Sequence, residues 1–393
     1  RAWCEYGWPE TVTYEMLYNL YSRGGLAFGA VDKLVGNCWK TYPQIAETTK
    51  PAATPWEKSA AQTLTPAFWR AFKEADRRRL VGRFSALLLR IADNQSWDMP
   101  AGKGRLVEAV PAWAGELTIG PLNADKTSPE YGKATRWTYK TQGVDLTVHP
   151  SRIFILGEWR EGALGFLEPA YNDFVTIEKL SGGSGESFLK NAARQMNINF
   201  DKEVKLADIA KARGIDLKAL QIVFNETAKD LNAGNDVALI TQGAAVTPMT
   251  SAIPDPEPAY RITTSNISSG VDTPTRILIG NQSGERSSTE DNRYYNSRCQ
   301  SRRVGDLSFD IAGCVAQLQA NRVIDAKDGF LVVWDDLAEP TAADRLENAK
   351  KLAEIAERYA ATGVEAFSVE EVREAAGYAD TAAPRALGED DET

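Results

Sequence analysis

The sequence predicts an α+β protein, and two patterns carry this prediction. Apolar residues at helical spacing recur in long stretches toward both ends of the chain. Between about residues 105 and 157, short β-branched or aromatic runs alternate with Gly, Pro, Asn and Asp, which indicates an antiparallel β region. These runs are residues 105–110, 115–120, 136–140, 144–149 and 152–157. A length of 393 residues with 43% hydrophobic content is enough for two or more packed modules.

The N-terminal helical region spans residues 14–38 and breaks at Gly24 and Gly25. After this break, one apolar stripe predicts a buried helix. The stripe consists of Ala27, Val31, Leu34 and Cys38.

A second helical stretch begins after Thr65, which is a candidate N-cap, with Pro66 at the first helical position. We expect it to continue through the apolar residues up to Asp93. Its expected inward face begins with Phe68, Phe72 and Ala75.

Helical character returns at residues 165–180 and again at 188–196, and we expect Gly182 to Ser187 to interrupt the helix between them. Residues 216–231 predict another amphipathic helix, and residues 236–241 predict a strand. The Pro-rich segment 252–260 is a natural boundary.

Two later helices have capping boxes at their starts. Thr341 with Asp344 precedes the first, and Ser368 with Glu371 precedes the second, which Gly377 is expected to close. The acidic end "GEDDET" is expected to fray.

The segment "RILIGNQSGERSSTEDNRYY" (residues 276–295) raises the question of a nucleotide site, because an apolar run leads into a Gly-rich loop and then a helix. A P-loop requires G-x-x-x-x-G-K-[ST], whereas here only three residues separate Gly280 from Gly284, and Glu285 follows. We therefore interpret the segment as a loop, with Ser288 and Asp291 as a capping box for the next helix.

Other candidate chemical sites are weak. The "GGSGES" stretch lacks the third glycine of a dinucleotide fingerprint and follows a helix. His149 is the one histidine and has no nucleophile signature beside it, and the Asp335-Asp336 pair lacks metal-ligand spacing. We expect no catalytic residues, no metal and no cofactor. Two arginine clusters are expected to pair with an acidic neighbouring subunit rather than with phosphates. They are Arg77, Arg78 and Arg79, and Arg293, Arg298, Arg302 and Arg303.

The net charge, the cysteine positions and the length of the apolar runs exclude some classes of protein. A net charge of -9 argues against a broad basic surface that coats DNA. The four cysteines are scattered, which fits a reduced compartment better than a disulfide framework. No apolar run reaches about 18 residues, so we expect no membrane partner and no signal peptide.

Five segments, taken in order, resemble the portal protein family of tailed bacteriophages. The first three are "LYNLYSRGGLAFGAVDKLVGNCWK", "VHPSRIFILGEW" with "GALGFLEPAYNDFVTIEK", and "TPTRILIGNQSGERSSTEDNRYYNSRCQSRR". The last two are "FLVVWDDLAEPTAADRLENAKKLAEIAERYAATG" and "FSVEEVREAAG". The order of the segments carries the resemblance, because none of them is a highly specific motif.

The resemblance implies a portal-like fold with a mixed α/β wing, a helical stem and a small α/β clip, assembled into a ring. The implied divisions are 1–165 (wing), 166–195 (stem helix), 196–254 (clip), 255–277 (second stem helix), 278–291 (tunnel loop), 292–340 (wing helix and strand) and 341–393 (C-terminal wing or crown helices and acidic tail).

The resemblance also implies a non-enzymatic function. The ring, commonly of twelve copies, would conduct double-stranded DNA at the capsid vertex of the virion during packaging and ejection, after assembly in the host cytoplasm. Its implied partners are further copies of itself, terminase, the major capsid protein and a head-tail connector. The DNA-facing tunnel loop would contain Asn281, Gln282, Ser283, Gly284, Glu285, Arg286, Ser287 and Ser288, and Lys190 and Arg194 are candidate channel contacts.

Two alternatives stay open at this point. One is a nucleotide- or metal-dependent phage enzyme that uses the Gly-rich 280–291 loop or the Asp335-Asp336 pair. The other is a monomeric adaptor that binds other proteins. Assembly state separates the adaptor from a portal, because a portal must form a closed ring.

Overall fold

The computed structural model describes residues 5, 7–49, 51–160, 162–192, 196–200, 205–233, 244–248, 255–280, 285–337, 342–360 and 366–378. The helices are α2 (Tyr14–Arg23), α3 (Gly25–Cys38), α4 (Pro55–Thr63), α5 (Pro66–Gly82), α6 (Tyr171–Ala192), α7 (Leu206–Ala212), α8 (Leu217–Ala233), α9 (Glu257–Gly270), α10 (Thr275–Ile279), α11 (Glu285–Arg302), α12 (Ser308–Ala320), α13 (Ala342–Ala360) and α14 (Val369–Ala375). The strands are β1 (Gln44–Ala46), β2 (Phe84–Ala92), β3 (Arg105–Trp113), β4 (Leu117–Ile119), β5 (Trp137–Thr141), β6 (Val144–Val148), β7 (Ile153–Gly157), β8 (Met196–Phe200), β9 (Ala244–Pro248) and β10 (Leu331–Val333). This mixed composition confirms the predicted α+β class.

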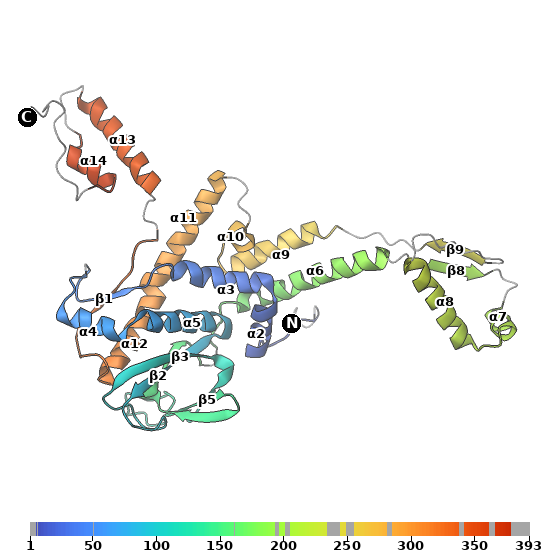
Figure 1. Ribbon diagram of the computed structural model, residues 1–393, viewed down its shortest axis with the longest axis horizontal. Coiled ribbons are helices and arrows are strands. Elements are labelled where there is room, and N and C mark those ends of the chain that lie inside the picture. The colour runs from blue at the N-terminus through green and yellow to red at the C-terminus, as the bar shows by residue number, and fades with distance from the viewer. Residues whose placement is uncertain are drawn as a thin grey trace, which may run out of the picture.

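The main body is built around an antiparallel sheet with the strand order β3-β2-β7. Helix α5 packs on β2 and β3, and α2 and α3 pack on α5 (Figure 1). The smaller antiparallel sheet β4-β5-β6 covers the other face, as the packing of Leu117 and Trp137 with Leu88 indicates. The region predicted to be antiparallel β is therefore antiparallel throughout its paired strands.

The prediction of continuous helix up to Asp93 is wrong, because α5 ends at Gly82 and β2 follows at once. Arg83 ends the helix with a φ of 67°, in the left-handed region. Successive side chains of β2 point to opposite faces. Leu87 and Leu89 join the helical core, whereas Ala86 and Leu88 join the core shared with the smaller sheet. A strand buried on both faces gives a continuous apolar run, which periodicity alone does not distinguish from a buried helix.

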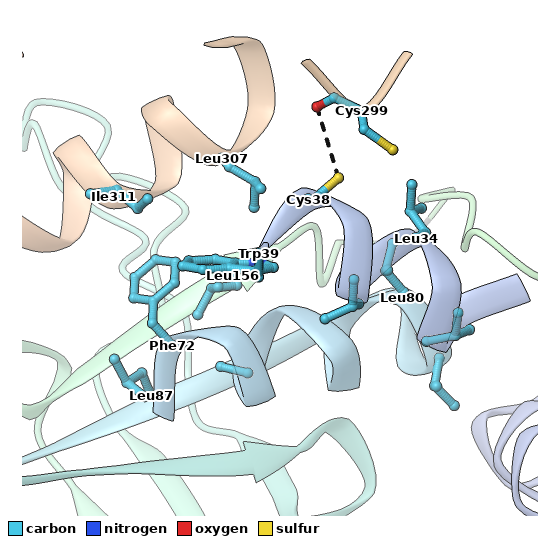
Figure 2. Packing of buried hydrophobic residues seen from close by; sticks show 14 of the residues in the cluster. Leu34, Cys38, Trp39, Phe72, Leu80, Leu87, Leu156, Cys299, Leu307 and Ile311 are labelled. Atoms are coloured by element: carbon cyan, nitrogen blue, oxygen red, sulfur yellow. Dashed lines mark hydrogen bonds between the residues drawn. The ribbon is translucent and has the colours of Figure 1, made fainter. Parts of the chain in front are cut away.

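The helical core confirms the apolar stripes that the sequence predicted. Thr65 accepts a hydrogen bond from Phe68 N and so caps α5 as expected. Figure 2 shows Leu307 and Ile311 above Trp39 and Phe72, with Cys38 and Leu34 of α3 to the right. The predicted inward residues are all buried: Ala27, Val31, Leu34, Cys38, Phe68, Phe72 and Ala75.

Helices α6 and α9 pack side by side and project from the body, and α7, α8, β8 and β9 lie beyond the end of α6 (Figure 1). The predicted interruption of this helix is wrong, because α6 runs without a break through Gly182, Gly183 and Gly185. A Cβ atom at any of these three glycines would meet no atom within 4 Å, so packing within this chain does not require glycine at these positions. The strand predicted at residues 236–241 lies outside the described residues.

Helix α11 continues through a π-helical segment, Arg303–Leu307, into α12. Helices α13 and α14 pack on each other at the C-terminal end of the described chain (Figure 1). The Ser368 capping box is confirmed, since the Ser368 hydroxyl accepts from Glu371 N and the Glu371 carboxylate accepts from Ser368 N. Gly377 closes this helix with a φ of 84°. Thr341 and residues 388–393 lie outside the described residues, although α13 begins directly after Thr341.

Candidate functional site

The predicted tunnel-loop residues lie between α10 and α11. Residues 281–284, which are Asn281, Gln282, Ser283 and Gly284, lie outside the described residues. Glu285, Arg286, Ser287 and Ser288 form the first turn of α11. Ser288 therefore does not cap this helix, and the predicted Ser288–Asp291 capping box is wrong, because the helix begins three residues earlier. Lys190 lies near the end of α6, on a different element, and Arg194 is outside the described residues.

The segment before the loop is helical. Residues Thr275–Ile279 form α10, so the strand that a P-loop requires is replaced by a helix. Gly280 ends α10 in the left-handed region, with a φ of 85°, and its N–H donates to Arg276 O at 2.8 Å. A glycine suits this position because a Cβ atom disfavours positive φ.

Lys33 holds the end of α10 against α3. Its Nζ donates to the carbonyl oxygens of Ile277 and Leu278, at 2.5 and 2.9 Å. The last carbonyls of a helix have no partner within the helix, so an outside donor is needed to satisfy them. Burial lowers the pKa of the Lys33 ammonium.

Asp272 joins the turn after α9 to helix α11. Its carboxylate accepts from Tyr294 Oη at 2.6 Å and pairs with Arg298 Nε at 2.7 Å. Asp272 has a φ of 48°, an uncommon conformation that these bonds help to hold. The hydrogen bond to Asp272 raises the pKa of Tyr294. Across the loop, Arg276 Nε of α10 lies 4.0 Å from Asp291 Oδ2 of α11.

Helix α11 is also fixed directly to α3. Asn37 Nδ2 donates to Asn296 Oδ1 at 3.0 Å, and the Cys38 thiol approaches Cys299 O at 3.8 Å (Figure 2). The helices on both sides of the proposed loop, α10 and α11, are thus attached to α3. The contacts on the two sides of the loop are made by Lys33, Asn37, Asp272, Tyr294 and Arg298.

Six of the seven arginines of the two clusters bond within this chain, which corrects the expectation that they pair with a neighbouring subunit. Among the first cluster, Arg77 pairs with Asp32, Arg78 with Glu74, and Arg79 with Asp76 and Asp310. In the second cluster, Arg298 pairs with Asp272 and Arg302 with Asp76, while Arg303 donates to Cys38 O and Asp335 O. Arg293 is exposed.

Asp76 is the centre of the buried part of this network. Its carboxylate is fully buried and accepts from Trp39 Nε1 at 2.9 Å and from Arg302 Nη2 at 2.5 Å. Burial by itself would raise the pKa of Asp76, but the guanidinium groups of Arg302 and Arg79 outweigh it, and the net pKa is lowered. Asp76 therefore carries its charge in the core and links α5 to α11.

The remaining candidate site residues are His149, Asp335 and Asp336. His149 Nδ1 accepts from Ser151 N at 3.2 Å and caps the short 3₁₀ turn Pro150–Arg152, as expected for a structural histidine. Asp335 and Asp336 are exposed. Within the described ranges, no group of three or more His, Cys, Asp or Glu side chains is placed to hold a metal ion. Across the same residues, no helix is both long enough and apolar enough to span a membrane.

Sequence reasoning missed Lys33 and Asp272. Lys33 gives no sequence signal because its acceptors are backbone carbonyls 244 and 245 residues away. Asp272 had a partial signal, since it stands in "GVDTP", where Gly, Asp and Pro mark a turn. Its ionic partner on α11 depends on how the helices pack.

Comparisons with known proteins agree with this architecture. The family model described as "Phage portal protein" matches residues 15–358. The fold is similar to a chain in the neck of a native gene transfer agent (GTA) particle computed with C12 symmetry, with TM-score 0.54, 13% identity and 92% of each chain covered. A chain in the virion of a native GTA particle gives TM-score 0.54, 14% identity and 94% coverage of each chain.

A crystal structure of a HK97 family phage portal protein from Corynebacterium diphtheriae has TM-score 0.48 and 14% identity, with 82% of this chain and 98% of that chain covered. A search of curated proteins gives no match. The family match covers most of the chain, from α2 to the last turn of α13. This chain therefore belongs to the phage portal protein family.

Proposed function

We propose that this protein forms a closed ring of about twelve copies at one capsid vertex of a virion and conducts double-stranded DNA during packaging and ejection. The family match over residues 15–358 is the observation that carries this proposal. The fold likeness to a neck structure computed with C12 symmetry supports the ring. The partners of such a ring are the major capsid protein, terminase and a head-tail connector, with assembly in the host cytoplasm.

We assign the parts of the ring to segments of this chain as a further part of the proposal. Residues 1–165 form most of the wing, 166–195 and 255–277 the stem helices, and 196–254 the clip. The packing of α6 on α9, apart from the sheets of the body, supports the assignment of a stem. Residues 292–340 return to the wing, and 341–393 form the C-terminal wing or crown.

Residues 278–291 are the proposed tunnel loop. Asn281, Gln282, Ser283, Gly284, Glu285, Arg286, Ser287 and Ser288 are the residues assigned to meet DNA. Gly and Ser suit a chain segment that must adapt as an irregular double helix passes. Lys190 and Arg194 on the stem side are candidate weak contacts with phosphate.

The acidic net charge of -9 is consistent with a conduit. Each lysine-phosphate or arginine-phosphate contact releases counterions and makes DNA adhere, so a channel benefits from few of them. The arginines of both clusters that pair within the chain are also occupied, which leaves less free cationic charge for DNA. We propose that the ring moves DNA without catalysing a reaction of its own.

Electron microscopy of the purified protein, with light scattering on the same sample, tests the proposal. We expect rings with a central hole and a mass of about twelve times the 43.1 kDa of one chain. A compact monomer at every concentration tested would contradict the ring and favour the adaptor alternative. Titration of the same sample with a nucleotide and with divalent metal ions then tests the enzyme alternative.

A further inference from the structure

Lys33 occupies an unusual position for a lysine. It belongs to α3, a helix whose inward residues are apolar, and its side chain reaches the end of α10 rather than solvent or a carboxylate. Its Nζ donates to two consecutive carbonyl oxygens, Ile277 O and Leu278 O. A Cβ atom added at Gly280 would lie 3.6 Å from the same Nζ, so Lys33 also lies against the residue where α10 ends.

The contacts on the other side of the loop are independent of Lys33. Asp272 binds Tyr294 and Arg298 of α11, and Asn37 of α3 binds Asn296 of α11. The middle of α11, at residues 294–298, is therefore held by Asp272 and Asn37, whereas the end of α10 is held by Lys33. Loss of Lys33 should release one side of the loop and leave the other side fixed.

We propose that Lys33 is a positioning residue, which fixes the end of α10, up to Gly280, on α3. The consequence for DNA rests on the proposed function, because the residues that follow Gly280 are those we assign to the channel. The interaction is charge-assisted, and hydrogen bonds of this kind are stronger than neutral ones.

The first test is hydrogen exchange of two amides of α10 that the helix protects, Leu278 N and Gly280 N. Lys33→Met keeps the length of the side chain but removes its donors, and we expect exchange on the order of tenfold faster at both amides. Lys33→Arg retains a donor for the carbonyls and should restore slow exchange. Lys40→Met is the matched control, because Lys40 is an exposed lysine just after α3, and it should leave the rates unchanged. Unchanged exchange in Lys33→Met would overturn the positioning role.

The second test measures DNA packaging by particles that carry each variant. We expect Lys33→Met to form rings but to package several-fold less DNA, with rescue by Lys33→Arg. Faster exchange with normal packaging would overturn the role of Lys33 in DNA passage. If the wild-type protein formed no ring, the proposed function would fail, and the exchange measurement would still decide whether Lys33 positions α10.

Discussion

At the scale of single residues, buried charge decides how the helices of the body meet. Asp76 is fully buried and is bound by Trp39, Arg79 and Arg302, which come from three different parts of the chain. A buried charge is tolerated only when its partners replace the hydration that it loses. We therefore expect a substitution of Asp76 to cost more stability than volume-conserving exchanges of the apolar residues around it.

Asp76→Asn should strongly destabilise the protein. The substitution removes the negative charge but leaves the guanidinium groups of Arg79 and Arg302 in the core. Breaking a buried pair in this way costs about 3–5 kcal/mol of unfolding free energy. Chemical unfolding followed by circular dichroism measures the loss. Asp145→Asn, at an exposed position of β6, is the control and should change the unfolding free energy by less than about 0.5 kcal/mol.

The contribution of Asp76 should also depend on pH. The pKa of Asp76 is lower in the folded protein than its ordinary value. The charged form therefore stabilises the fold above the unfolded pKa of about 3.9, and this stability is lost as the pH falls through the folded pKa. Unfolding at a series of pH values should show the difference between wild type and Asp76→Asn shrinking below about pH 4. A constant difference across that range would contradict the assignment.

At the scale of elements, local backbone geometry fixes the hairpin β5-β6. Thr141 pairs with Val144, so Gln142 and Gly143 form a two-residue turn, with φ values of 46° and 78°. Two positive φ values in succession define a type I′ turn, whose twist matches that of the strands and which favours Asn-Gly. The turn chemistry therefore sets the register of the smaller sheet.

Gly143→Ala should lower the unfolding free energy by about 1–2 kcal/mol, because an L-residue is strained in the left-handed region. The cost comes from the backbone alone, since a Cβ atom at this position meets no atom within 4 Å. Gln142→Asn is the matched change in the other direction, and we expect a slightly more stable protein. Thermal unfolding of both variants checks the prediction, and a neutral Gly143→Ala would argue against the type I′ turn.

For the glycines of α6 we expect the opposite effect, namely that replacement by alanine stabilises the helix. Gly182, Gly183 and Gly185 have open space around them, and alanine is favoured over glycine in a helix by about 0.8–1 kcal/mol per residue. Replacing all three by alanine should slow amide exchange along α6. Gly24→Ala is the contrasting control, because its Cβ would lie 2.6 Å from Leu20 O and should destabilise the helix junction. Faster exchange in the triple variant would show that α6 does not run through this segment in solution.

At the scale of the whole molecule, charge governs how DNA would move through the proposed ring. Glu285 stands beside Arg286 in the first turn of α11, within the proposed tunnel loop. We infer that the Glu285 carboxylate weakens the binding of DNA phosphates to this loop. In a ring of about twelve copies, every copy would weaken phosphate binding in the same way.

Glu285→Lys should therefore slow or stall DNA passage, and the effect should be greatest at low ionic strength. Packaging rate in particles that carry the variant is the measurement. Glu290→Lys makes the same charge change one and a half turns further along α11 and should have a smaller effect. An unchanged packaging rate with Glu285→Lys would contradict this role of the Glu285 carboxylate.

Much of the fold was predictable because its signals are local. The caps at Thr65 and Ser368, the stripe on α3 and the short strands between residues 105 and 157 depend on residues close together in the sequence. The family resemblance was also recognisable from the order of the segments, and the family match confirms it.

The failures were places where distant residues decide the structure. The apolar run of β2 predicts helix because both faces of this strand are buried, by elements that lie before and after it in the chain. The start of α11 was placed at Ser288 from a capping pattern, but the helix begins at Glu285. The extension of α6 through its glycines contradicts local propensity, so propensity alone could not predict it.

The sequence by itself determined the α+β class, the positions of several helices and strands and membership of the portal family, because these depend on local periodicity, capping residues and segment order. Only the tertiary structure decided which charges pair. It paired six arginines of the two clusters within the chain, and it brought Lys33 to a helix end 244 residues away. The physical reason is that an ion pair or a capped carbonyl depends on distance in space, which packing sets and sequence separation does not.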